Sequence, residues 1–184
     1  MKTTTETQPR IFLTDYASYN NGTQFEFGHW VNLEDFSSAD ELSDYITEHF
    51  EEADKKSPLD SPREEIMITD FEGFPSELYS ESGMDFDALF EYLELDDDDK
   101  IKVAFILEQG ESFEYAMQKY EDVSLIDDTD SAIYDEFEMY YPEAEKAQEH
   151  CPYLTIDYDQ FKRENYTQFE HEGVNYLVSD NWNY

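Results

Sequence analysis

A stretch of oxygen-bearing side chains lies near the spacing of a calcium-binding loop. Its members are Asp127, Thr129, Ser131, Asp135 and Glu138. The position that an EF-hand loop reserves for glycine carries Ala132, and the stretch is helical in pattern, which disfavours an EF-hand. The run from Asp96 to Asp99 fails in the same way, because Ile101 and Leu107 stand at the glycine and bidentate positions.

The residue spacing also gives no support for a zinc site, a cysteine nucleophile or a phosphate-binding loop. The four histidines form no H-x-x-x-H pair, and His150 and Cys151 are neighbours without a partner motif. Six glycines spread over the chain form no phosphate-binding loop. With 47 acidic residues, carboxylate pairs arise by chance and do not identify a glycosidase. We therefore expect no enzyme, no catalytic residue, no cofactor and no metal site.

The acidic residues themselves are the strongest chemical signal. The formal net charge is -36, from 47 Asp and Glu against 11 Lys and Arg. Residues 64–149 hold 28 of the acids and only four bases, and so carry two thirds of the net charge. Such a density exceeds that of an ordinary solvated face and disfavours nucleic acid and anionic membranes as partners. We expect these carboxylates to form a partner-binding surface that mimics DNA.

The acids assigned to this surface are Glu64, Glu65, Asp70, Glu72, Glu77, Glu81, Asp85, Asp87, Glu91, Glu94, Asp96, Asp97, Asp98, Asp99, Glu108, Glu111, Glu114, Glu121, Asp122, Asp127, Asp128, Asp130, Asp135, Glu136, Glu138, Glu143, Glu145 and Glu149.

The aromatic content shows that the chain folds. Aromatic residues make up 17% of it, whereas disordered acidic chains are poor in large rings. Tyr16, Tyr19, Phe25, Phe27 and Trp30 could form a base-stacking platform, but with few Lys or Arg nearby we expect core packing instead. A single cysteine, a polar N-terminus and the lack of a long apolar run predict a cytoplasmic protein.

The patterning predicts an α+β fold built from a chain of small units. A disordered arm (1–9) precedes an N-terminal α+β unit (10–60) with a strand at 11–13, an Asn-Gly turn, a strand at 25–31 and a helix beginning at the capping box 38–41. A middle, mainly helical unit (61–110) has a strand at 65–71, a helix capped by Ser82, and a segment at 101–109 that reads as helix or strand.

The C-terminal α+β unit (111–184) has helices at 112–120 and 131–141, a short helical piece after Pro142, a strand at 123–126 and a hairpin around Glu172-Gly173. To match the linear charge density of DNA, about one charge per 1.7 Å, the chain would have to be elongated.

Three segments resemble the ArdA family of antirestriction proteins. These are the segment from Arg10 to Gly22 followed by Gly28-His29-Trp30-Val31, the segment from Glu64 to Pro75, and the hairpin region from Tyr166 to Tyr184. The resemblance implies a mobile-element or phage protein that works in the host bacterial cytoplasm as an elongated homodimer. It would block Type I restriction–modification enzymes by mimicking DNA, with the methyltransferase and specificity core as partner.

Three alternatives stay open at this point. The target could be another DNA-binding defence system, such as CRISPR. The chain could be an acidic hydrolase or a calcium-binding protein. It could also be an acidic protein adapted to high salt.

Overall fold

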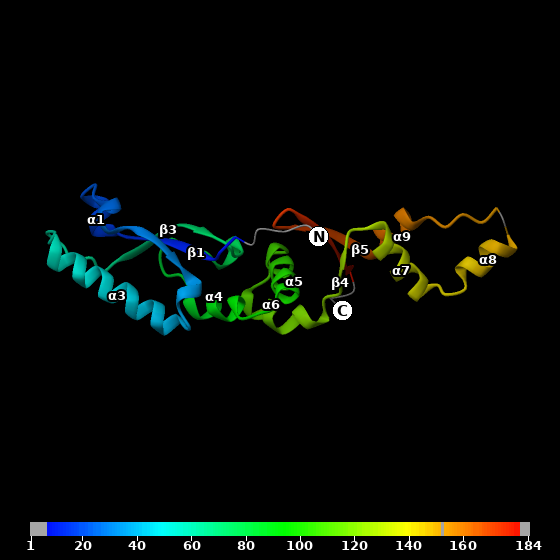
Figure 1. The fold of residues 1–184 in the computed structure, drawn as a ribbon, viewed down its shortest axis with the longest axis horizontal. Coiled ribbons are helices and arrows are strands. Elements are labelled where there is room, and N and C mark those ends of the chain that lie inside the picture. Colours follow the sequence, from blue (N-terminus) through cyan, green and yellow to red (C-terminus); the bar gives the residue numbers. More distant parts are fainter. Residues whose placement is uncertain (1–6, 152, 181–184) are drawn as a thin grey trace. The chain divides into compact units, whose positions relative to one another are not determined.

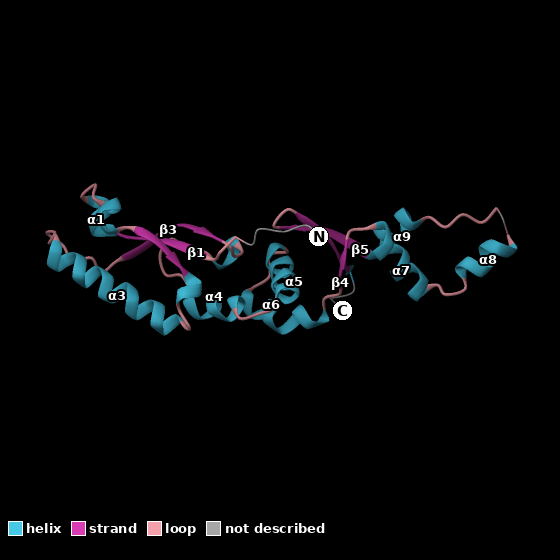
Figure 2. Ribbon diagram, in the orientation of Figure 1, coloured by secondary structure: helices cyan, strands magenta, loops and turns pink. Residues whose placement is uncertain are grey.

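A computed structural model describes residues 7–151 and 153–180, without the side chain of Glu145, and has the predicted α+β class (Figure 1). Two compact units divide the chain, the first ending at Leu95 and the second beginning at Asp96. Among the described residues, the strands form two three-stranded antiparallel sheets, one in each unit, and Figure 2 shows them as the two groups of arrows.

The sheet of the first unit has the strand order β2-β1-β3. Its strands are β1 (Arg10–Asp15), β2 (His29–Asn32) and β3 (Ile66–Glu72). β1 pairs with both neighbours, and its register on β3 shifts between Phe12 and Leu13. Because β3 pairs with β1, segments on both sides of the boundary predicted at residue 60 share one sheet. The division into three units stays a prediction.

One face of this sheet packs against α3 (Ala39–Lys56), which runs along it in Figure 1. Ile11 and Leu13 alternate toward this side and are fully buried. The predicted helix is confirmed, and Leu42, Ile46, Phe50 and Ala53, at steps of three and four, form its buried face. Ser38 caps the helix by accepting from the Glu41 N–H, whereas the Glu41 carboxylate accepts from Ser37 and not from Ser38.

The strand predicted at 25–31 is wrong in its first half. The chain forms α1 (Tyr16–Asn20) and α2 (Gln24–Phe27) before β2 begins at His29. Asp15 starts α1 by accepting from the Ser18 N–H, and the Asn-Gly turn follows this short helix with Gly22 at φ +70°. The alternation of Phe25, Phe27 and His29 imitates a strand, so the period of two misled the prediction.

The arm predicted at 1–9 lies partly outside the described residues. Its described part is tied to the sheet, because the Leu33 N–H donates to the Pro9 carbonyl at 2.9 Å. Gly73, at φ +79°, allows this close approach, since a Cβ there would lie 2.7 Å from Pro9 Cα.

The remaining elements of the first unit are short. They are η1 (Leu33–Asp35), η2 (Ser76–Leu78) and α4 (Phe86–Leu93). Asp85 caps α4 through the Ala88 N–H, so the predicted cap Ser82 is wrong by three residues. Asp85 sits immediately before the first helical residue, where a side-chain oxygen can reach a free N–H of the first turn.

A buried ionic network joins three segments of the first unit. The Arg63 side chain is fully buried, and its Nη1 donates to Asp54 Oδ1 at 2.6 Å and to the Ser57 carbonyl at 2.9 Å. Its Nε donates to Ser18 Oγ at 3.0 Å and lies 3.7 Å from Asp15 Oδ2. Arg63 therefore links the end of α3 to the start of α1.

The sheet of the second unit has the strand order β4-β6-β5. Its strands are β4 (Leu125–Asp127), β5 (Tyr166–His171) and β6 (Val174–Ser179). The predicted hairpin is confirmed: β5 and β6 pair from Tyr166↔Ser179 to His171↔Val174, and Glu172 and Gly173 turn with positive φ.

Helices pack on both faces of this second sheet. On one face, Phe105 of α5 (Asp97–Glu108) meets Phe169 edge-on, with ring centroids 5.4 Å apart. On the other, Tyr166 and Leu177 form a core with Ile133 and Phe161. Residues 166 and 169 are an odd number apart and so point to opposite faces. The helical alternative at 101–109 is confirmed. The sequence could not separate helix from strand here, because α5 is buried on almost every side and so lacks a polar face with helical spacing.

The other helices of the second unit follow the predicted order with one addition. They are α6 (Phe113–Lys119), η3 (Tyr120–Asp122), α7 (Asp130–Tyr140), α8 (Ala144–His150) and α9 (Tyr158–Asn165). The sequence analysis missed α9, which Asp157 caps by accepting from the Gln160 N–H. Within the described ranges, no helix is long and apolar enough to span a bilayer.

Candidate partner-binding surface

The predicted acidic surface is distributed over nearly every element from β3 to α8. Ten of its 28 carboxylates belong to the first unit and eighteen to the second. Four side chains are half-buried, the side chain of Glu145 is not described, and the other 23 are exposed. The half-buried ones are Glu72, Asp99, Asp128 and Glu136.

Few of these carboxylates form ion pairs with basic side chains. Eight of the ten Lys and Arg residues within the described ranges form ion pairs, all with acids of their own unit. Five acids of the predicted surface are paired in this way, namely Glu72, Asp99, Asp122, Asp128 and Glu143. Among the other members with described side chains, no ion pair is formed. The net negative charge therefore sits on exposed carboxylates without a cationic partner.

Four carboxylates from three segments of the second unit converge on Tyr176, and we call them the Tyr176 acidic cluster. They are Asp97, Asp98, Asp127 and Glu172. Burial raises the pKa of the Tyr176 phenol, and the negative charges of these four carboxylates raise it further. Asp127 stands directly opposite Tyr176 in the β4–β6 ladder. The cluster shows that acids far apart in sequence act on one point.

Helix α5 supplies two members of this cluster at its N-terminus. Asp96 caps the helix by accepting from the Asp99 N–H at 3.0 Å, and Asp97 to Asp99 fill the first turn. The positive end of the helix dipole stabilises carboxylates at this place, which offsets part of their mutual repulsion. The start of α5 thus holds several carboxylates close together.

Glu172 is the member of the cluster that the sequence analysis did not assign to the surface. It lies in the β5–β6 turn at φ 50°, beyond the segment 64–149 whose charge density drew attention. The Glu-Gly turn signal placed it between two strands, close in sequence to Tyr176 of β6. Asp127, in contrast, reaches Tyr176 only through the pairing of β4 with β6.

A second, smaller convergence lies in the first unit around Tyr79. Burial raises the pKa of this phenol, and the carboxylates of Glu81 and Asp70 raise it further. The Tyr79 hydroxyl donates to the Ile68 carbonyl at 2.8 Å, which holds the ring beside β3. Both units therefore gather predicted acids around a tyrosine.

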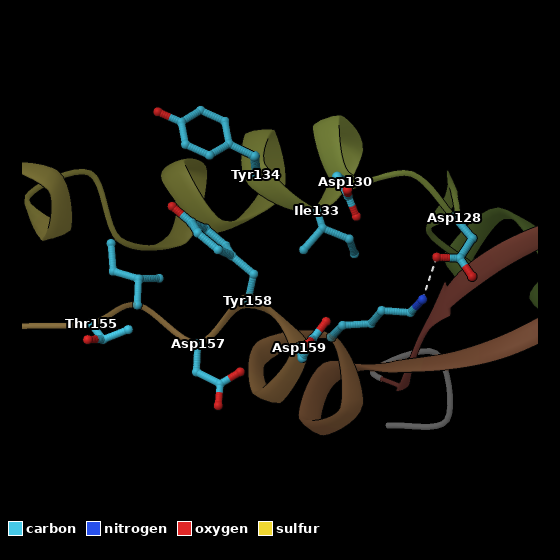
Figure 3. A pocket seen from close by; sticks show the side chains of 10 residues that line it. Asp128, Asp130, Ile133, Tyr134, Thr155, Asp157, Tyr158 and Asp159 are labelled. Carbon is cyan, nitrogen blue, oxygen red and sulfur yellow. Dashed lines mark hydrogen bonds and ion pairs between the residues drawn. The ribbon is translucent and has the colours of Figure 1, made fainter.

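A pocket of about 620 Å³ in the second unit lies between α7 and the segment leading into α9 (Figure 3). Ile133 and Tyr158 point into the space, whereas Asp157 points away from α7 and caps α9. Lys162 pairs with Asp128, and this hydrogen bond lowers the pKa of the Asp128 carboxyl. Its charged groups thus serve helix starts and an internal ion pair, and its lining holds no nucleophile with an adjacent base.

Metal chemistry has no site in the part of the chain that the structure describes. No group of three or more His, Cys, Asp or Glu side chains there is placed to hold an ion. The stretch considered as a calcium loop contains Thr129, which caps α7 through the Ala132 N–H, and continues as that helix. Its carboxylates consequently follow a helical surface and do not surround a common centre.

A family model described as "Antirestriction protein (ArdA)" matches residues 11–177. No curated protein matches the chain. The match spans both compact units and includes the whole acidic segment 64–149.

Proposed function

The chain belongs to the ArdA family of antirestriction proteins, and we propose that it blocks Type I restriction–modification enzymes by occupying their DNA-binding groove as a DNA mimic. The proposed partner is the methyltransferase and specificity core of such an enzyme, in the cytoplasm of the bacterial host. In this role the protein acts as a binding inhibitor and not as an enzyme.

The observation that supports this proposal is the large set of exposed carboxylates without cationic partners. Channels that grip DNA are lined with Lys and Arg, and DNA binding gains free energy by releasing counterions from phosphates. Carboxylates held on folded elements can replace phosphates in the same channel. Three members of the Tyr176 acidic cluster stand on α5 and β4, so their backbone positions are set before binding and less ordering entropy is lost.

An inhibition assay with matched charge variants tests the proposal. The variant Asp97→Asn/Asp98→Asn/Asp127→Asn removes three charges from the Tyr176 acidic cluster with little change in shape. Asp40→Asn/Asp44→Asn/Glu48→Gln removes three exposed charges from α3, outside the predicted surface. We expect the first to weaken inhibition of a purified Type I enzyme and to lower the salt slope of binding by roughly 2 to 3 log units per decade of salt. We expect the control to change both much less.

Equal effects of the two variants would contradict the assignment of the surface. They would show that net charge alone is read, without regard to position. Failure of the wild-type protein to inhibit any Type I enzyme, with inhibition of another DNA-binding defence system, would replace the proposed target by the alternative one.

We further propose that the protein acts as a homodimer, with residues 139–151, 153 and 154 of the second unit at the interface. Tyr153 is 95% exposed and Met139 67% exposed. Among its described side chains, α8 has none that is buried. A helix of seven residues is marginal in water without packing support, so a second copy that covers this stretch would stabilise it. Light scattering should give twice the chain mass, and Met139→Ser/Tyr153→Ser should shift it toward a single chain.

A further inference from the structure

The outer face of the sheet in the first unit carries an exposed aromatic group. Ile11 and Leu13 face the core, so Arg10 and Phe12 face the opposite side. In the ladder, Phe12 stands opposite Trp30 on one side and Asp70 on the other. We call Arg10, Phe12, Phe25 and Trp30 the outer aromatic face.

Ring contacts hold this face in a fixed geometry. Phe12 meets Trp30 edge-on at 5.6 Å and Phe25 edge-on at 6.2 Å between centroids. The Arg10 guanidinium lies 4.4 Å over the Trp30 ring and pairs with Glu72 at 2.7 Å. Gly28 lets the backbone approach, because a Cβ there would lie 3.2 Å from Phe12 Cε1.

Phe25 is 76% exposed and Tyr19 is 55% exposed, so the expectation of core packing is wrong for both residues. The Phe25 ring meets that of Phe12 at 6.2 Å between centroids, and most of its surface gains nothing from burial within the unit. Glu26 follows Phe25 in α2, Asp70 stands opposite Phe12 in the β1–β3 ladder, and both carboxylates are exposed. Aromatic residues, Phe among them, are enriched at protein–protein interfaces, so an exposed ring next to exposed carboxylates suits a protein partner.

We propose that the outer aromatic face is a docking site for a Lys- or Arg-bearing patch of the inhibited enzyme, with Phe25 as its anchor. This inference rests on the proposed function and adds a contact that no phosphate mimic supplies. A basic side chain can lay its apolar stem on Phe25 while its charged head pairs with Glu26 or Asp70. The acidic rim complements a basic protein surface, whereas it repels nucleic acid and anionic membranes.

The docking site has a signature that separates it from the carboxylate surface. Phosphate-like contacts weaken steeply with salt, because they depend on counterion release. Apolar contact with an aromatic ring does not depend on counterions. Removal of the anchor should therefore weaken binding by the same factor at every salt concentration and leave the salt slope unchanged.

Phe25→Ala, Phe25→Tyr and the control Tyr19→Ala test this inference. Tyr19 is 55% exposed on α1 and lies outside the outer aromatic face. Affinity is measured against a purified Type I methyltransferase–specificity complex from about 50 to 200 mM salt, the range over which phosphate contacts lose most affinity. We expect Phe25→Ala to weaken binding roughly five- to thirtyfold at each salt concentration, the effect of one hot-spot residue. Phe25→Tyr and Tyr19→Ala should stay near wild type, and circular dichroism should show all three folded.

Two outcomes would overturn the inference alone. In the first, Phe25→Ala binds with wild-type affinity while the wild-type protein shows its normal salt slope. In the second, Phe25→Ala changes the salt slope of binding and does not lose affinity by the same factor at every salt concentration. Phe25-dependent binding to single-stranded DNA or to anionic vesicles would replace the protein partner by another ligand. A wild-type protein that does not bind the complex would contradict the proposed function, and this inference with it.

Discussion

Replacing Arg63 by Met should destabilise the first unit far more than any surface change. The side chain is fully buried and holds Asp54, Ser57 and Ser18, and it lies beside the buried carboxylate of Asp15. Removing one partner of a buried ion pair costs about 3 to 5 kcal/mol, because the other charge stays buried without compensation. This is a large part of the roughly 5 to 15 kcal/mol by which a typical domain is stable.

Arg10→Met is the matched control in the same unit. Arg10 pairs with Glu72, but the side chains are 42% and 39% exposed, so its loss should cost less than about 1.5 kcal/mol. Urea unfolding followed by Trp30 fluorescence, in a Trp182→Phe background, reports on the first unit alone. Adding Asp15→Asn to Arg63→Met should recover more than about 1 kcal/mol, because Asn removes the uncompensated charge and can still cap α1.

Equal costs for Arg63→Met and Arg10→Met would refute this reasoning. They would mean that burial of the guanidinium network contributes nothing beyond an exposed pair. Full additivity of Asp15→Asn and Arg63→Met would also refute it, since it would show that the two groups do not interact.

Three further predictions concern protonation, helix caps and dimensions. Burial lowers the pKa of His49, so the folded state favours the neutral ring. The free energy of unfolding should therefore fall as the pH drops through about 6.5, the pKa in the unfolded chain, and should level off below the folded pKa. In urea titrations at several pH values, His49→Gln should flatten this dependence. Asp85→Ala and Asp96→Ala should each cost about 1 kcal/mol in thermal unfolding by loss of the cap, whereas the Asn variants should stay within a few tenths; equal losses for Ala and Asn would mean that charge and not capping matters. The elongation expected from charge density stays a prediction, and small-angle scattering would contradict it with a radius of gyration near the roughly 16 Å of a compact chain of this length.

Local signals in the sequence predicted most of the elements. The capping box at 38–41 located the start of α3, and Glu172-Gly173 located the last hairpin. These succeed because caps and turns depend on neighbours within four residues. At 25–31 the period of two predicted one strand, whereas the chain forms α2 up to Phe27 and begins β2 at His29.

Contacts between distant segments could not be predicted from periodicity. The pairing of β3 with β1 and the burial of Arg63 both join segments about fifty residues apart. The acidic character of the candidate surface follows from composition alone, but the approach of Asp127 to Tyr176 requires the pairing of β4 with β6. The exposure of Phe25 was equally hidden, since an aromatic residue in an alternating pattern normally indicates core.

The central claim is that this protein and DNA occupy the same groove. The most direct test is binding of the protein to a purified Type I methyltransferase–specificity complex in the presence of increasing amounts of target duplex. We expect the apparent dissociation constant to rise in proportion to duplex concentration, with no ternary species by native mass spectrometry, because both ligands use the same basic channel. A stable ternary complex of enzyme, duplex and protein would contradict the account.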